Sequence, residues 1–191
     1  MGACDMAKGK RVNPRRIPLA KDKIDKAAII NDVSYANLYY AWLLVLYAML
    51  EQEAKTPDEV KRLWNAADRA CVEEGLKTWE IHDAEQLMGL KEPHPNLNMY
   101  AVRSLAELEA FKRKARENAV FIALCSICLG LDNGGLLDKA QLRRVFANVS
   151  LTLAEIESSC TSYDQLAADI TRHGLSVNET DAEISLSSTE T

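Results

Sequence analysis

The sequence predicts an all-α protein, a helical bundle made of two similar units in tandem. Three observations support this prediction. The middle of the chain is rich in Ala, Leu, Glu, Lys and Gln, whose side chains lose little conformational freedom in a helix. Only 8 Gly and 5 Pro occur among 191 residues, so long segments lack helix breakers. Apolar residues recur at three- and four-residue spacing in most of these segments, as on the buried face of an amphipathic helix.

The first helical unit is expected at residues 21–91. Its first helix should begin near Asp22 or Asp25 and run to about Ala54, because neither Pro nor Gly interrupts this segment. The centre of the helix, residues 39–50, reads YYAWLLVLYAML. A helix this apolar must be buried against another element to be stable in water.

The other two helices of this unit have recognisable ends. In the segment KTPDEV, Thr56 and Glu59 have the spacing of a capping box, and Pro57 suits the first helical position. The second helix should therefore begin here, and Gly75 should end it. A shorter third helix is expected at about residues 79–90.

A linker at 92–103, which contains Pro and Asn, precedes the second unit at 104–175. Ser104 and Glu107 again have the spacing of a capping box. The order of a long, a medium and a short helix then repeats. These helices are expected at 105–131, 136–156 and 161–175. The remaining residues, 176–191, are expected to form a disordered acidic tail.

Alignment of the two units supports a tandem duplication. The apolar centre at 39–50 matches residues 118–129 at an offset of 79, and Leu63 and Trp64 match Val145 and Phe146 at an offset of 82. The alternative is chance similarity between two amphipathic helix sets. In either case the two long helices should pack together in one core. The residues expected at their contact are Trp42, Leu43, Leu46, Leu50, Phe121, Leu124 and Cys128.

The composition favours a soluble protein of the cytoplasm. The two most apolar runs, residues 39–50 and 119–131, are shorter than the roughly 20 residues that a membrane-spanning helix needs. The first residues carry charge without an apolar stretch behind them, so no signal peptide is expected. The five cysteines are an odd number, which suits free thiols in a reducing compartment.

No catalytic, cofactor-binding or metal site is expected. Cys125 and Cys128 have CxxC spacing, but no second pair or HxxxH accompanies them, so core packing is the favoured interpretation. His82 and Glu85 should share a solvated helical face. The segment DNGGLLD at 132–138 lacks the ligands of a calcium loop and is expected to form a turn. Since phosphate loops and hydrolase motifs are also missing from the sequence, we expect a protein that is not an enzyme.

Charge is distributed unevenly along the chain. Residues 1–26 contain eight Lys or Arg and three Asp, a net charge of +5, whereas the whole chain has -5. Residues 1–20 are expected to form a flexible basic arm that contacts phosphates; a solubilising terminus is the alternative. A second basic stretch at 111–116 extends the candidate contact surface, or is simply a solvated face. The candidate contact residues are Lys8, Lys10, Arg11, Arg15, Arg16, Lys112, Arg113 and Arg116.

The arm contains the motif RVNPRRIP at residues 11–18, directly before a long helix with an apolar centre. In these features the chain resembles small helical proteins of phages and prophages of Gram-positive gut bacteria. The resemblance implies a setting in which anti-CRISPR inhibitors of Cas effectors occur.

Together with the acidic body, the resemblance leads us to expect a non-catalytic binding protein that inhibits or modulates a nucleic-acid-handling complex in the host cytoplasm. The alternative is a regulator that binds DNA or RNA directly through the arm. An acidic body argues against a protein that simply coats DNA, which would be basic overall.

Overall fold

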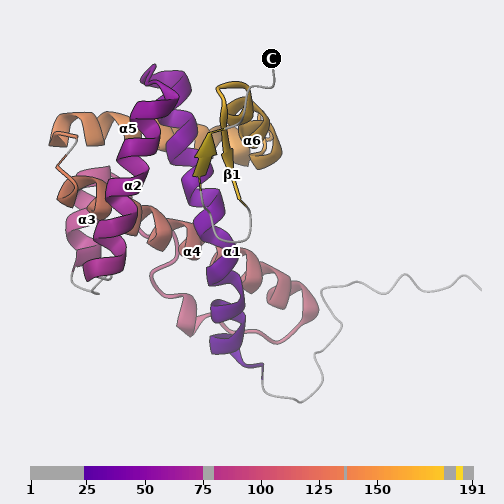
Figure 1. Ribbon diagram of the computed structural model, residues 1–191. Helices are drawn as coiled ribbons and strands as arrows, with labels where there is room; N and C mark the ends of the chain where they lie inside the picture. Colours follow the sequence, from indigo (N-terminus) through magenta and orange to yellow (C-terminus); the bar gives the residue numbers. More distant parts are fainter. Residues whose placement is uncertain (1–23, 75–79, 136, 179–183, 187–191) are drawn as a thin grey trace, which may run out of the picture.

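The computed structural model describes residues 24–74, 80–135, 137–178 and 184–186, with side chains except at 34–36, 68–74 and 184–186. Within these residues the fold is a bundle of α-helices with one small β-hairpin (Figure 1). The predicted all-α class is confirmed. The six predicted α-helices are all present, although their ends differ by a few residues from the expected positions.

The helices follow one another in the predicted long, medium, short order. Their bounds are α1 Lys26–Tyr47, α2 Pro57–Glu74, α3 Glu80–Met88, α4 Leu105–Asn133, α5 Lys139–Glu157 and α6 Tyr163–Arg172. Figure 1 shows α1 running through the middle of the molecule, with α2 and α3 on one side and α6 on the other. A short 3-10 helix, η3 (Leu97–Met99), lies in the predicted linker.

Both predicted N-terminal caps form, with one difference. Before α2, the Glu59 N–H donates to Thr56 Oγ1 at 3.3 Å and the Thr56 N–H donates to Glu59 Oε2 at 2.8 Å, which completes a capping box. Before α4, Ser104 Oγ accepts from the Glu107 N–H at 3.3 Å. The Glu107 carboxylate, however, accepts from the N–H of Arg103 at 2.6 Å, one residue earlier than expected.

The end of the first helix is π-helical. Asp25 caps the start of α1, and beyond Tyr47 the chain continues as η2 (Ala48–Gln52). This turn places two carboxylates against other helices: Glu51 lies 2.7 Å from Nε2 of His173, and Glu53 lies 3.4 Å from Nε of Arg144. The end of this helical segment is therefore connected to α5 and to the end of α6.

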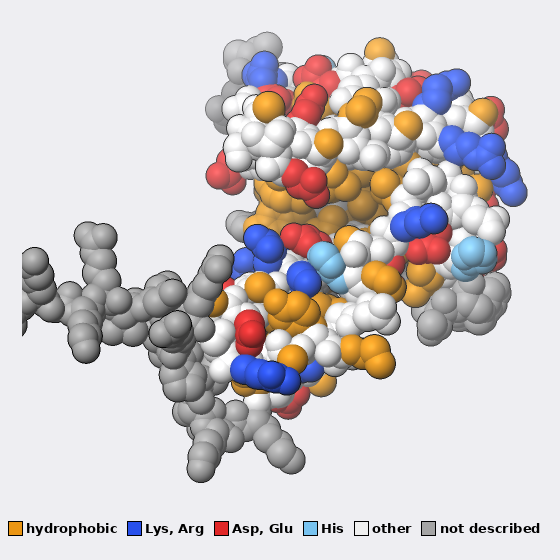
Figure 2. All heavy atoms as spheres, turned by 180° about the vertical axis from the view of Figure 1, so that it is seen from behind, with side chains coloured by type: hydrophobic (Ala, Val, Ile, Leu, Met, Phe, Trp, Pro, Cys, Tyr) orange, Lys and Arg blue, Asp and Glu red, His pale blue; other side chains and the backbone are white. Residues whose placement is uncertain are grey.

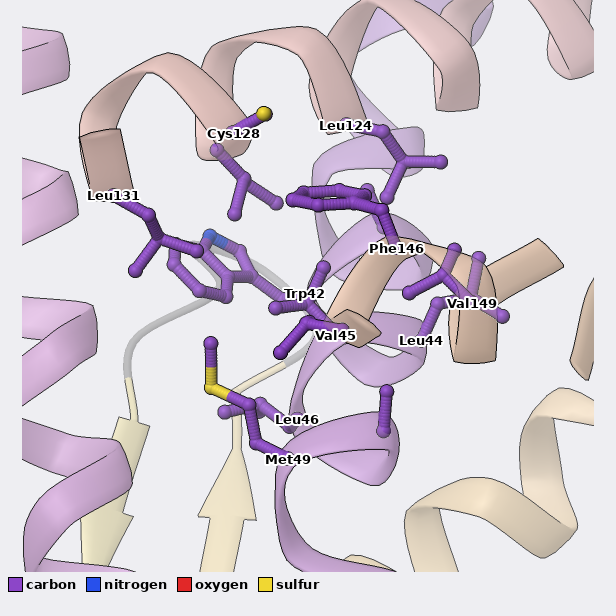
Figure 3. Close-up of a cluster of buried hydrophobic side chains, with 14 of the residues drawn as sticks. Trp42, Leu44, Val45, Leu46, Met49, Leu124, Cys128, Leu131, Phe146 and Val149 are labelled. Atoms are coloured by element: carbon purple, nitrogen blue, oxygen red, sulfur yellow. The ribbon is translucent and has the colours of Figure 1, made fainter. Parts of the chain in front are cut away.

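The main core lies where α1 and α4 pack together, as predicted from their apolar centres. Figure 3 shows Trp42 of α1 beside Leu131 and near Cys128 of α4, with Phe146 and Val149 of α5 in the same cluster. All seven residues predicted for the contact are 5% exposed or less. They are Trp42, Leu43, Leu46, Leu50, Phe121, Leu124 and Cys128.

The short helix of each predicted unit packs on the long helix of the other unit. The short helix α3 packs on α4, and the short helix α6 packs on α1. This arrangement is expected if two similar units are related by an approximate two-fold axis. Within the described residues, the π-helical turn after α1 and the hairpin after α6 have no equivalent in the other unit. The tandem duplication stays a prediction.

A second, smaller cluster lies at the far end of the α1–α4 pair. Phe111 is fully buried there and packs with Leu97 and Ala115. Tyr100 and the first turns of α1 cover this cluster. The predicted linker therefore contributes buried side chains of its own.

The prediction of a disordered tail at 176–191 is wrong for residues 176–177 and 184–186, which form strands. β1 (Leu175–Val177) pairs antiparallel with β2 (Ile184–Leu186), with Leu175 opposite Leu186. Leu175 is fully buried in the main core, and Val177 packs against it. The apolar residues alternate with Ser176, the period of a strand. The other residues after 178 lie outside the described part of the chain.

Among the described residues, no single helix is both long and apolar enough to cross a membrane. One bent pair of helical segments, Lys26–Val33 with Asn37–Gln52, meets the criteria of length and composition together.

Candidate binding groove

Three of the predicted contact residues lie on the first half of α4. Lys112 Nζ pairs with Glu109 at 3.1 Å, and Nε of Arg113 lies 3.7 Å from a carboxylate oxygen of Glu117. Arg116 is exposed and has no ion-pair partner among the residues that the structure describes. The other predicted contact residues lie outside this part of the chain. They are Lys8, Lys10, Arg11, Arg15 and Arg16.

Arg113 and Arg116 line a groove of about 470 Å³ on the surface of the bundle. The groove lies between α4, the end of α5, the start of α6 and the segment that follows α3. In Figure 2 it is the apolar recess in the centre of the face, with charged side chains along its edges. Its apolar lining consists of Tyr40, Leu90, Pro93, Val120, Phe121, Leu124, Leu153, Ile156 and Tyr163.

The floor of the groove is formed by core side chains. Val120, Phe121 and Leu124 line it and are only 8%, 4% and 1% exposed. The groove therefore reaches down to the main core. Asn37 of α1 also lines the groove and is buried, so the groove extends inward as far as the central helix.

Two tyrosines form part of the groove wall. The rings of Tyr40 and Tyr163 lie with their centroids 4.5 Å apart and join α1 to α6. Burial raises the pKa of Tyr163 to about 12, and the nearby Tyr40 and Glu157 add to this shift. The Tyr163 phenol therefore stays protonated at neutral pH and can donate a hydrogen bond.

The two edges of the groove differ in charge. Lys91, Arg113 and Arg116 belong to the segment after α3 and to α4, whereas Glu157 belongs to the end of α5. Glu117 also lies on the α4 edge, but its carboxylate contacts Arg113 and His94. Lys91 is exposed and, like Arg116, has no ion-pair partner within the described ranges. The unpaired charge on the α4 edge is thus positive.

Hydrogen bonds hold the segment after α3 against α4. The side-chain amide of Asn118 donates to Glu92 Oε1 and to the carbonyl oxygen of His94, each at 2.9 Å. Its carbonyl oxygen accepts from the His94 N–H at 3.0 Å. His94 Nε2 also contacts the carboxylate of Glu117. This network fixes the backbone that carries Lys91 and Pro93, and so one edge of the groove.

This network was not predicted from the sequence. Glu117 is 23 residues from His94 along the chain, so no local pattern links the two side chains. The available signal was Asn118, a polar residue at the start of the apolar run on α4. Lys91, Tyr40, Tyr163 and Glu157 were not predicted as site residues either.

The remaining chemical groups lie apart from the groove or in the core. His82 pairs with Glu85 at 3.5 Å on an exposed face, as predicted. The part of the chain that the structure describes contains no group of three or more His, Cys, Asp or Glu residues able to hold a metal ion. Whether the protein is an enzyme stays a prediction.

The CxxC pair should be chemically unreactive in the folded protein. Cys125 and Cys128 are buried free thiols, and burial raises the pKa of each to about 12, whereas Cys160 is exposed. The thiolate is the reactive form, so at pH 8 brief treatment with iodoacetamide should label Cys160 and spare the pair. Peptide mass spectrometry after labelling, with and without denaturant, measures this. Equal labelling of Cys125 and Cys160 in the native protein would show that the pair is accessible.

Comparison of the chain with known protein families, curated proteins and solved structures found no match. The fold and the groove describe a helical protein with an apolar surface groove, one edge of which carries positive charge that is unpaired among the described residues.

Proposed function

We propose that the protein is a non-catalytic binding protein that modulates a nucleic-acid-handling complex in the cytoplasm of a bacterial host. One observation carries this proposal: the cationic side chains of Arg113, Arg116 and Lys91 lie beside an apolar groove. A surface that combines apolar area with unpaired charge suits a protein partner, because apolar burial supplies affinity and charge selects the orientation.

A complex is a better candidate than bare nucleic acid. The chain has a net charge of -5, and Glu117 and Glu157 lie at the groove itself. The partly exposed apolar residues of the lining, such as Leu153 and Ile156, gain nothing from phosphate contact, but they gain from burial against an apolar protein surface. A Cas effector with its guide RNA is the example that the resemblance to phage proteins suggests.

The proposal is tested by titrating the labelled protein with a Cas effector loaded with guide RNA. Arg116→Glu should weaken binding by about threefold to tenfold, since it replaces an unpaired cation at the contact edge by a repulsive charge. Arg143→Glu is the matched control, because Arg143 is exposed on α5 and does not line the groove. The absence of binding, or equal effects of the two variants, would count against the groove as the contact surface.

Direct binding of DNA or RNA is the second candidate, favoured by the +5 charge of residues 1–26. Electrophoretic mobility of labelled duplex DNA or RNA with the purified protein separates the two functions. Tight binding that weakens steeply with salt, without any other protein, favours the regulator.

Deletion of residues 1–18 tests the role of the arm. Every described helix lies beyond this segment, so helix content and thermal unfolding should be unchanged. If the arm contacts phosphates, affinity for the loaded effector should fall, and the slope of log affinity against log salt should flatten by about one unit per lost contact. Arg15→Glu with Arg16→Glu should do more harm than both residues changed to Ala. A solubilising arm predicts no change in affinity or in slope.

A further inference from the structure

We propose that the groove is a binding site for an anionic amphiphile with a single acyl chain, such as a long-chain carboxylate. The chain would lie on the apolar floor and the head group beside Arg116. This inference does not depend on the proposed function, because it concerns a small ligand rather than a protein or nucleic-acid partner.

The size and lining of the groove suit a small ligand with an apolar part. Its volume of about 470 Å³ is in the range of small-molecule sites. Its floor residues Val120, Phe121 and Leu124 belong to the buried core, so the floor is apolar and already packed from below. An acyl chain needs only such an apolar surface, without hydrogen-bonding partners along its length.

The order of residues along α4 separates a head-group end from a tail end. The α4 residues that line the groove run from Arg113 to Leu124, which is about 16 Å along the helix axis. The charged ones, at 113–117, come first, and the apolar ones, at 120–124, follow. This length and this change from charged to apolar match an extended acyl chain with one polar head.

The unpaired charge favours an anionic head. Arg113 is engaged by Glu117, whose carboxylate also contacts His94, but Arg116 has no ion-pair partner in the described segments. A carboxylate beside Arg116 would give this guanidinium the planar, two-point partner that it lacks. Glu157, on the opposite edge, would repel the same head group, so the α4 edge is the favoured position.

The test is isothermal titration calorimetry of the full chain with dodecanoate, below its micelle concentration. Dodecylammonium has the same chain with the opposite charge and serves as the control ligand. We expect one dodecanoate per protein and at least about tenfold weaker binding of dodecylammonium. Arg116→Gln should weaken dodecanoate binding by about tenfold and remove most of the preference for the anion. Arg143→Gln, away from the groove, should bind as the unmodified chain does.

Three results would overturn the proposal. They are the absence of dodecanoate binding, equal affinities for the two head groups, and an unchanged affinity in Arg116→Gln. Binding of a designed acidic amphipathic peptide without binding of dodecanoate would also overturn it, and would identify the groove as a helix-docking site. Both the Arg116→Gln and Arg143→Gln proteins should keep the circular dichroism and thermal unfolding of the original, since both side chains are exposed. Failure of dodecanoate to bind would leave the effector-binding experiment, and hence the proposed function, unaffected.

Discussion

Replacing Trp42 with alanine is expected to lower the free energy of unfolding by about 3 to 5 kcal/mol. Trp42 is 5% exposed in the contact between α1 and α4, and its ring lies 6.1 Å from that of Trp64 on α2. In Figure 3 it lies beside Leu131 and near Cys128. Alanine would leave a cavity between two long helices, which cannot close it without moving their other contacts. Because small domains are stable by only about 5 to 15 kcal/mol, this loss is a large part of the total.

Urea denaturation followed by circular dichroism at 222 nm measures the effect, since this signal does not depend on the tryptophan that is removed. Leu151→Ala is the control: Leu151 is also a large apolar residue on a helix, but it is 61% exposed. Its replacement should change stability by no more than about 0.5 kcal/mol. Similar midpoints for the two variants would mean that the α1–α4 contact is not the centre of the core.

Much of the fold follows from local signals in the sequence. Thr56 with Glu59, and Ser104 with the N–H of Glu107, form the predicted caps because these hydrogen bonds involve residues only three apart. The apolar centres of the two long helices predicted their mutual contact, because helices this apolar must be buried against another apolar element. For the same reason the buried residues on these helices could be named in advance.

The groove could not be predicted in the same way, since five separate segments form it. The contact of His94 with Glu117 depends on the path of the chain after α3, and no local pattern encodes that path. Tyr40 and Tyr163 meet in the wall of the groove although they are far apart in the sequence. Arg113 and Arg116 were predicted as exposed cations, but nothing in their spacing indicated the apolar recess beside them.

The hairpin was missed for a different reason. Strands of three residues, such as β1 and β2, are too short to show a convincing period of two, and the segment between them is polar. Composition therefore favoured a tail. Burial of Leu175 in the main core holds β1 against the bundle. The position of Leu175, and hence its burial, depends on where α6 ends.

Replacing Phe111 with alanine is expected to destabilise one end of the molecule rather than the whole. Phe111 is fully buried, but its cluster is separate from the main core and, among the residues that the structure describes, includes only two other buried residues, Leu97 and Ala115. The ring lies 6.4 Å from that of Tyr100, and Lys26 Nζ lies 5.8 Å from its centroid. Phe111 thus connects the linker and the start of α1 to α4.

Because so few side chains form this cluster, removing its largest member should increase local opening there before the main core unfolds. A loss of about 3 kcal/mol corresponds to amide hydrogen exchange that is about a hundredfold faster. We expect this acceleration at the N–H groups of Tyr100 and Ile29, which donate to Leu97 and Asp25 respectively. Amides of α5 around Phe146 should exchange at nearly the original rate.

The matched comparison is Trp42→Ala, which should accelerate exchange in α5 as well as in the linker, because its side chain belongs to the main core. Native-state exchange followed by NMR or by mass spectrometry measures both variants. Uniform acceleration in Phe111→Ala would contradict the prediction and show that the two clusters unfold as one cooperative unit. Selective acceleration would identify the linker and the first turns of α1 as the least stable part of the bundle. Since the linker continues from the segment that carries Lys91, one edge of the groove would then adjoin the region that opens most readily.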